Sequence, residues 1–264
     1  MNVFSSFHTH TCFCDGKNTP REMVEQAVAL GCPSIGFTGH SWTPFDPGYC
    51  MDALRERQYQ QQVLELKQEY SDRISVHLGL EQDYFSPPPQ KNYEYLIGSV
   101  HYVKKNGKFL SIDDTPELLR KGIEELYGGD PYSLCEDYFA LAAQVPDKTH
   151  CQIVGHFDLI TKFNAHGEFF DEKNPRYRKV ALSALDRLLA QGALLEINTG
   201  AVARGYRKEP YPAPWLLQEM GRQGAEAVIT SDAHQAQNLL FGMEQAAESA
   251  LKCGIRVIDF RTKL

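Results

Sequence analysis

Short apolar runs rich in valine, isoleucine and phenylalanine alternate along the chain with longer amphipathic segments. Such short runs are typical of buried strands, whereas the longer segments have the residue spacing of helices. The pattern therefore predicts strands at residues 3–8, 34–38, 75–80, 95–100, 152–156, 193–197, 227–230 and 256–259.

Local signals mark where several helices begin. Thr19, Pro20 and Glu22 have the spacing of a capping box with a proline in the first turn, and Gly31 predicts the end of that helix. Pro212 predicts another helix start in the same way. Similar signals or an amphipathic pattern predict further helices at 52–70, 115–128, 131–143, 175–190, 212–224 and 238–252.

The alternation of strand and helix, repeated at least six times, predicts a parallel sheet with crossover helices, an α/β fold. A doubly wound open sheet and a closed barrel both fit this order of elements. No long linker rich in proline, glycine or serine interrupts the pattern. We therefore expect one domain that covers residues 1–264.

Side chains of the kinds that bind metals stand at or just beyond the carboxyl ends of six predicted strands. They are His8 and His10, His40, Glu81, His101, His156, and Asp232 with His234. Strand ends converge on one face of a barrel. An open sheet would spread six strands over roughly 24 Å at ~4.8 Å per strand, too far for one small site. The pattern favours a barrel with a metal site at the carboxyl ends of its strands.

The spacing of these residues also has a physical meaning. Residues i and i+2 of an extended chain point the same way, so His8 and His10 can hold one ion and Asp232 and His234 can project from one edge. Asp15 precedes Gly16 in a predicted tight turn within reach of the same face. The candidate ligands are then His8, His10, Asp15, His40, Glu81, His101, His156, Asp232 and His234.

Other histidines and the cysteines have simpler interpretations. His77 lies within a predicted strand and His150 in a predicted loop, so both are expected to be structural. Cys12 and Cys14 resemble half of a thiolate zinc site, but no second pair with suitable spacing follows. We expect these two cysteines to fill space beside the histidines rather than to bind metal.

Composition narrows the classes of function. The 264 residues carry a formal net charge of −7 and contain no basic block, which disfavours an extended nucleic-acid surface. The chain has no apolar run of transmembrane length and no start typical of a signal peptide. Seven irregularly spaced cysteines disfavour a disulfide framework. We expect a cytoplasmic protein that binds a small molecule and neither nucleic acid nor membrane.

The candidate ligands define the expected chemistry. Imidazole and carboxylate without thiolate suit Zn, Mn or Fe, and nine ligands are enough for two or three divalent ions. Three such ions would outweigh the charge of the three carboxylates, so the site would favour a phosphate dianion. No sequence motif for a serine or cysteine nucleophile and no phosphate-binding glycine loop is present. Water activated by the metals, as a bridging hydroxide, is the expected nucleophile.

The set of ligand positions resembles that of the polymerase and histidinol phosphatase (PHP) family over nearly the whole chain. Within that family, the stretches HTHTCFCDGKNTP, GSVHYV, VGHFDLITKFN, LEINTGAVARGYRKEPYP and SDAH are most similar to the histidinol-phosphate phosphatases. The resemblance implies a distorted (β/α)7 TIM-like barrel with a trinuclear metal site. It also implies hydrolysis of L-histidinol phosphate to L-histidinol and phosphate, a step of histidine biosynthesis.

The resemblance also implies how the ligands are shared. His8, His10, Glu81 and Asp232 would hold one ion. Glu81 would bridge to a second ion held by His101 and His156. Asp15, His40 and His234 would hold the third, although some relatives have histidine at the position of Asp15. Glu81 and Asp232 would then act in catalysis as well as in binding.

Basic residues near the strand ends are candidates for holding the phosphate. Arg204 follows a strand that ends in Glu196-Ile-Asn198, so we expect it to lean over the metals, bind phosphate through its planar fork and assist catalysis. Lys162, Arg207 and His166 are further candidates for contact with the substrate.

Other functions remain compatible with the sequence. A PHP-type nuclease or exonuclease would use the same metals, but the acidic balance of the chain disfavours it. Another small-molecule phosphoesterase is a second possibility. A catalytically silent interaction module is a third, against which the complete set of ligands argues.

Overall fold

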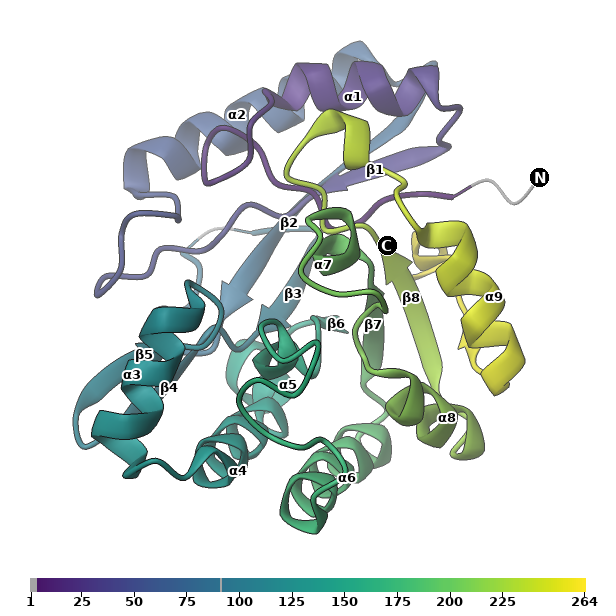
Figure 1. Ribbon diagram of the computed structural model, residues 1–264. Coiled ribbons are helices and arrows are strands. Elements are labelled where there is room, and N and C mark those ends of the chain that lie inside the picture. Colours follow the sequence, from purple (N-terminus) through teal and green to yellow (C-terminus); the bar gives the residue numbers. More distant parts are fainter. Residues whose placement is uncertain (1–3, 91) are drawn as a thin grey trace.

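The computed structural model describes residues 4–90 and 92–264, and within them one parallel sheet of seven strands runs in the order β1-β2-β3-β6-β7-β8-β9. The sheet curls around a central axis, and helices lie outside it (Figure 1). The strands are β1 (Ser34–Phe37), β2 (Ser75–Asp83), β3 (Tyr95–Ser99), β6 (Ile153–Val154), β7 (Leu194–Asn198), β8 (Glu226–Thr230) and β9 (Arg256–Val257).

The predicted strand at residues 3–8 is not a regular strand. Val3 lies outside the described residues, and the chain beyond it makes isolated bridges, from Ser6 to Ile35 of β1 and from Thr9 to Ala233 just past β8. The segment therefore lies between β1 and β8 and takes the seventh position of the barrel. The last strand, β9, pairs with the beginning of β8, on the edge of β8 that faces away from β7. The expected distorted TIM-like α/β barrel is confirmed.

The crossover helices cover the outer surface of the sheet (Figure 1). Among them, α2 packs on β2, α5 packs on β3, and α9 packs on β8 and β9. The helices are α1 (Pro20–Ala29), α2 (Ala53–Glu69), α3 (Pro116–Tyr127), α4 (Pro131–Ala142), α5 (Val145–Thr149), α6 (Pro175–Ala190), α7 (Gly200–Ala203), α8 (Pro214–Arg222) and α9 (Met243–Cys253). In the described part of the chain, no helix combines the length and the apolar character needed to cross a membrane.

Two predicted helix starts need correction. The predicted capping box of Thr19 and Glu22 is present at the start of α1. The first correction concerns α8, which begins at Pro214 and not at Pro212. The residues before α8 are held extended, because Tyr211 bridges to Asn198 and the Ala213 backbone N–H donates to an Asp158 carboxylate oxygen at 2.9 Å.

The helix expected at 238–252 also begins later. Residues Ala236–Asn238 form a short 3₁₀ turn, and α9 starts at Met243 after Gly242. Gly242 has a left-handed φ of 70°, which breaks the helical path and suits glycine. The last helix is therefore a turn or more shorter than its amphipathic pattern suggested.

Large side chains fill one end of the barrel interior. Phe7, Tyr95 and Phe260 pack edge to face with ring centroids 5.2–5.9 Å apart, and Phe260 belongs to the 3₁₀ turn Phe260–Lys263. The Tyr95 hydroxyl donates to the Phe7 carbonyl oxygen at 2.7 Å. A Cβ at Gly36 would lie 2.1 Å from that hydroxyl, so the packing requires glycine there. The imidazole of His77 also packs here, with its ring centroid 5.6 Å from that of Phe7.

The long connection from β3 to β6 contains a β-hairpin that the sequence analysis did not predict. Its strands are β4 (Tyr102–Lys105) and β5 (Lys108–Ser111), joined by Asn106 and Gly107, both with positive φ. Asn-Gly is a strong signal for such a two-residue turn. The expected helices α3 and α4 follow the hairpin, and α5, which the sequence analysis did not predict, comes after them.

Candidate metal centre

The nine candidate ligands lie together at the carboxyl ends of the strands, and Glu81 is at their centre. Five imidazoles have a ring nitrogen within 3.4 Å of one of its carboxylate oxygens. His40 Nδ1, His8 Nε2 and His10 Nε2 lie 2.9, 3.3 and 3.4 Å from Oε2. His156 Nε2 and His101 Nε2 lie 3.0 and 3.3 Å from Oε1. Each oxygen of Glu81 thus faces a different set of imidazoles, the arrangement that a bridging carboxylate needs.

Asp15 and Asp232 complete the cluster on the side of Glu81 Oε2. Asp15 Oδ2 lies 3.1 Å from His234 Nε2, and Asp232 Oδ1 lies 3.2 Å from His10 Nε2. Ligand atoms fall within 4.8 Å of one another in three sets: His10, Asp15, His40 and His234; His8, His10 and Asp232; and His40, Glu81 and His101. These sets place His40 beside Glu81 and His10 beside Asp15, which the expected assignment had kept apart.

Several atoms at the centre are buried without a hydrogen-bond partner among the described residues. They include His8 Nε2, His10 Nε2 and Glu81 Oε2, which all face one another. A buried polar atom left unsatisfied costs about 1–3 kcal/mol. Cations between these atoms would satisfy all three, so the donor set and its geometry fit divalent metal ions.

The electrostatics of His10 and Glu81 agree with this fit. Burial, with help from the neighbouring His234 and His40, lowers the pKa of His10 to about 3. His10 is therefore neutral at physiological pH, as a metal ligand must be. Burial alone would raise the pKa of Glu81, but the surrounding imidazoles, His40 first, hold it well below its usual range. The carboxylate is ionised and available as a ligand.

The backbone brings Asp232 into the cluster in an unexpected way. Asp232 and His234 both reach the site, but Asp232 has a left-handed φ of 45° instead of the extended conformation assumed from the sequence. Strained backbone of this kind concentrates at functional sites. The Asp232 side chain passes close to Gly200, where an added Cβ would lie 2.8 Å from Asp232 Cβ and Oδ2. Glycine at the start of α7 therefore makes room for the carboxylate.

Some residues that the sequence analysis missed make hydrogen bonds to the candidate ligands and help to position them. Asp83 accepts from the backbone N–H of His101 at 3.2 Å and lies 3.3 Å from its Nδ1, and Ser99 donates to Glu81 Oε1 at 2.6 Å. Glu196 lies 2.6 Å from His8 Nδ1. Alternation along β2 was the available signal for Asp83, because residues two apart from Glu81 share its face.

Arg204 reaches the cluster from the end of α7. Its Nη2 donates to Asp232 Oδ2 at 3.1 Å, and its Nη1 lies 2.8 Å from His234 Nδ1. Its Nε is buried and has no partner among the described residues. Arg204 therefore lies beside the candidate ligands, where the sequence analysis expected it.

Lys162 lies farther out but within electrostatic reach of the ligands. Its Nζ donates to the Asp113 carbonyl oxygen at 2.6 Å and stands over the Tyr206 ring at 5.1 Å. Burial would raise the pKa of Asp113, but Lys162 and the imidazoles of His101 and His156 hold it below its usual range. Lys162 Nζ also lies 3.4 Å from Asp113 Oδ2, so the two residues form an ion pair.

Arg207 and His166 are placed less centrally. Arg207 donates to the Thr161 carbonyl oxygen at 3.0 Å and stands over the ring of Tyr211 at 4.9 Å. The centroid of the Tyr211 ring lies 6.3 Å from that of the His156 imidazole. Tyr211 therefore lies between Arg207 and this candidate ligand. His166 is exposed on a loop, and no contact between its side chain and the cluster is seen in the described structure.

Comparison with known proteins places these observations in a family. The PHP domain family matches residues 6–200. This chain belongs to the PHP family. A "Probable histidinol-phosphatase" of Deinococcus radiodurans is 33% identical over 99% of this chain and 98% of that protein. A histidinol-phosphatase of Bacillus subtilis is 26% identical over 91% of this chain and 97% of its own length.

A solved PHP structure shares the fold. The histidinol phosphate phosphatase of Lactococcus lactis, solved in complex with Zn, L-histidinol and phosphate, superposes with a TM-score of 0.72 at 21% identity. The match covers 96% of this chain and 95% of that one. The barrel of this PHP chain is therefore shared over nearly its whole length.

Cys12 and Cys14 of this PHP chain lie outside the three ligand sets. Cys14 Sγ lies 3.5 Å from His10 Nδ1 and donates to the Thr11 carbonyl oxygen at 3.4 Å. Burial, followed by the nearby Asp15, raises the pKa of the Cys14 thiol to about 12. Cys12 is exposed. That Cys12 and Cys14 do not bind metal stays a prediction.

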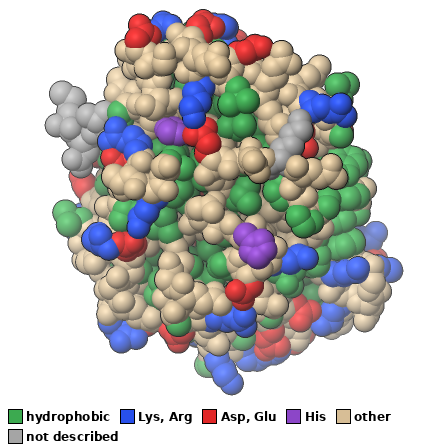
Figure 2. Space-filling view, turned by 180° about the vertical axis from the view of Figure 1, so that it is seen from behind, with side chains coloured by type: hydrophobic (Ala, Val, Ile, Leu, Met, Phe, Trp, Pro, Cys, Tyr) green, Lys and Arg blue, Asp and Glu red, His purple; other side chains and the backbone are tan. Residues whose placement is uncertain are grey.

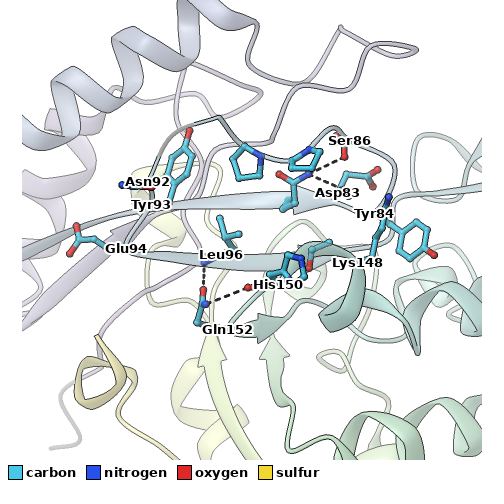
Figure 3. A pocket seen from close by; sticks show the side chains of 14 residues that line it. Asp83, Tyr84, Ser86, Asn92, Tyr93, Glu94, Leu96, Lys148, His150 and Gln152 are labelled. Atoms are coloured by element: carbon cyan, nitrogen blue, oxygen red, sulfur yellow. Dashed lines mark hydrogen bonds between the residues drawn. The ribbon is translucent and has the colours of Figure 1, made fainter.

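A separate pocket of about 420 Å³ lies beside β2 and β3, and Asp83, which contacts the candidate ligand His101, is one of its lining residues (Figure 3). Lys148, His150 and Gln152 line one side of it, and Tyr93 and Glu94 line the other. His150 ends α5 and points into this pocket region rather than toward the barrel interior, in keeping with a structural role.

Proposed function

We propose that this PHP protein hydrolyses L-histidinol phosphate to L-histidinol and phosphate, with divalent metal ions at the barrel mouth. The observation that carries the proposal is a cluster of nine imidazole and carboxylate side chains with Glu81 at its centre. The chain is matched over nearly its whole length by a protein named "Probable histidinol-phosphatase". Such a protein would act in histidine biosynthesis, in the cytoplasm.

The ligand groups support two or three transition-metal ions. His8, His10, Asp232 and Glu81 would hold one, with Glu81 shared with His101 and His156 for a second. Asp15, His40 and His234 would hold a third. Ions bound there would supply Lewis acidity and activate water near neutral pH. Zn, Mn and Fe all suit this set of nitrogen and oxygen donors.

Arg204 is the residue of this chain that we assign to the phosphate. Its guanidinium is oriented by Asp232, and its unpartnered Nε–H would be satisfied by a phosphate oxygen. An arginine in this position binds phosphate in a fixed geometry and adds positive charge where negative charge develops. Lys162, Arg207 and His166 remain candidates for the outer part of the substrate.

A nuclease of the same fold is the main alternative. Basic side chains on the face in Figure 2 are scattered among acidic and apolar ones, without a continuous basic track among the described residues there. A protein that follows a nucleic-acid backbone needs such a track. The formal net charge of −7, together with the lack of such a track on this face, favours a small phosphate monoester.

The test is a comparison of substrates with the metal-loaded protein. We expect kcat/KM for L-histidinol phosphate to exceed that for p-nitrophenyl phosphate and glucose 6-phosphate by at least about tenfold, or ~1.4 kcal/mol. A DNA strand with a free 3′ end serves as the matched polymer substrate. Equal kcat/KM for all the monoesters would reduce the proposal to a general phosphatase, and faster release of nucleotides from DNA would replace it with the nuclease.

A further inference from the structure

Glu196 is the most completely bonded carboxylate near the metal cluster, and it belongs to none of the ligand sets. It stands on β7 and is fully buried. Its Oε1 accepts from His8 Nδ1 at 2.6 Å and from the Thr230 hydroxyl at 2.5 Å. Its Oε2 accepts from the His156 backbone N–H at 2.7 Å and from Asn198 Nδ2 at 2.9 Å. These bonds use its full capacity as an acceptor.

The bond to His8 decides which ring nitrogen of that imidazole carries the proton. A carboxylate can only accept, so Nδ1 must be the donor and carry the hydrogen. In the neutral imidazole, the form that binds a metal, this leaves the free lone pair on Nε2, 3.3 Å from Glu81 Oε2 and 3.7 Å from Asp232 Oδ1. Nε2 of His8, which faces the other candidate ligands, is thus the atom that would bind a cation.

The other carboxylate oxygen of Glu196, Oε2, connects to two more candidate ligands, His156 directly and Asp232 through Asn198. His156 is held through its backbone N–H. Asn198 donates to Glu196 and also lies within 3.4 Å of Asp232 Oδ2. The orientation of the Asn198 amide is fixed, because its Oδ1 accepts from the Gly200 backbone N–H at 2.8 Å.

We propose that Glu196 is a positioning residue that sets the metal-binding tautomer of His8 and so determines the affinity of the ion held by His8, His10 and Asp232. The inference rests on the proposed metal occupancy and not on the identity of the substrate. A glutamate that orients a ligating histidine in this way typically accounts for about 10- to 100-fold in metal affinity.

Replacement by glutamine gives a specific expectation, because an amide must turn its NH₂ group toward one pair of donors. The His156 peptide N–H and the fixed Asn198 amide cannot become acceptors. The Thr230 hydroxyl can rotate, and His8 can move its proton to Nε2. In Glu196→Gln the NH₂ group therefore faces His8, and the proton of His8 moves to the nitrogen that faces the metals.

The experiment measures zinc bound per chain by equilibrium dialysis at buffered free zinc concentrations, with no substrate present. Glu196→Gln should bind one zinc ion per chain about 10- to 100-fold more weakly than the unsubstituted protein. Glu94→Gln is the matched control, because Glu94 also lies beside a histidine Nδ1, that of His77 at 3.3 Å, and accepts from a backbone N–H, that of Leu78, away from the cluster. The control should bind zinc normally.

A second measurement keeps the inference testable if the variant fails to fold. In the unsubstituted metal-free protein, ¹⁵N NMR of the imidazoles should show His8 protonated at Nδ1 and not at Nε2 alone. The proposal is overturned if His8 has the Nε2–H tautomer, or if a folded Glu196→Gln protein binds zinc as tightly as the control. Because neither readout uses histidinol phosphate, a failure of the proposed substrate would leave both results interpretable.

Discussion

Glu81→Gln is expected to lower kcat by at least about 100-fold, which corresponds to ~2.7 kcal/mol of transition-state stabilisation. Five imidazoles converge on this one carboxylate, and its two oxygens face different ligand sets. The amide has a similar shape but no charge, so it would weaken the hold on ions at both oxygens. The measurement is steady-state phosphate release from L-histidinol phosphate, with the metal content of each preparation determined.

Glu248→Gln provides the matched control for that substitution. Glu248 lies on α9, is mostly exposed, and its nearest ion-pair partner is Lys252 at 3.8 Å. The control should keep full activity and metal content. A Glu81→Gln enzyme that retains more than about a tenth of kcat, a loss below ~1.4 kcal/mol, would contradict a bridging role for Glu81.

Arg204→Ala should lower kcat/KM for L-histidinol phosphate by about 10- to 150-fold, because a charge-assisted contact of this kind is worth roughly 1.5–3 kcal/mol. The contacts of Arg204 with Asp232 and His234 add a condition to this prediction. Loss of the arginine also removes a neighbour of two ligands, so kcat/KM must be compared at equal metal occupancy.

The lysine variant separates charge from geometry. Arg204→Lys keeps the positive charge but loses the planar fork, so it should recover only part of the activity that Arg204→Ala loses. If Arg204→Ala is as active as the unsubstituted enzyme at equal metal content, the phosphate is bound elsewhere, and Lys162 becomes the first residue to examine.

The order of elements and the position of the site could be predicted from the sequence for a simple reason. Strands and helices have different periods, and parallel strands bring their carboxyl ends to one face. His40 and His156 follow β1 and β6, Glu81 lies near the end of β2, and their side chains all meet at the cluster. Ligands that sit at strand ends are therefore visible in a sequence even when the distances between them are not.

Features that depend on contacts between distant segments could not be predicted in this way. The segment from Ser6 to Thr9 looks like an ordinary strand, but it makes only single bridges to β1 and to the chain beyond β8. Pro212 carries a valid signal for a helix start, yet pairing of Tyr211 with Asn198 and of Ala213 with Asp158 delays the helix. In both places tertiary contacts override a local preference.

The residues behind the ligands were missed for a related reason. Glu196 and Asn198 were noted only as the end of a strand, because an isolated carboxylate in an apolar run has no spacing that marks its role. The contact of Glu196 with His8 joins residues 188 positions apart in the chain. Only the folded barrel shows that this carboxylate faces a ligand rather than a metal.

The most direct test of the metal-dependent phosphatase is to remove the metals and return them one equivalent at a time. Phosphate release from L-histidinol phosphate is measured while Mn or Zn is added to chelator-treated protein whose metal content is known. The account predicts almost no turnover in the stripped protein and a rise to a plateau at about two to three ions per chain. Undiminished turnover in protein shown to be metal-free, or no release of phosphate from this compound at full metal loading, would contradict it.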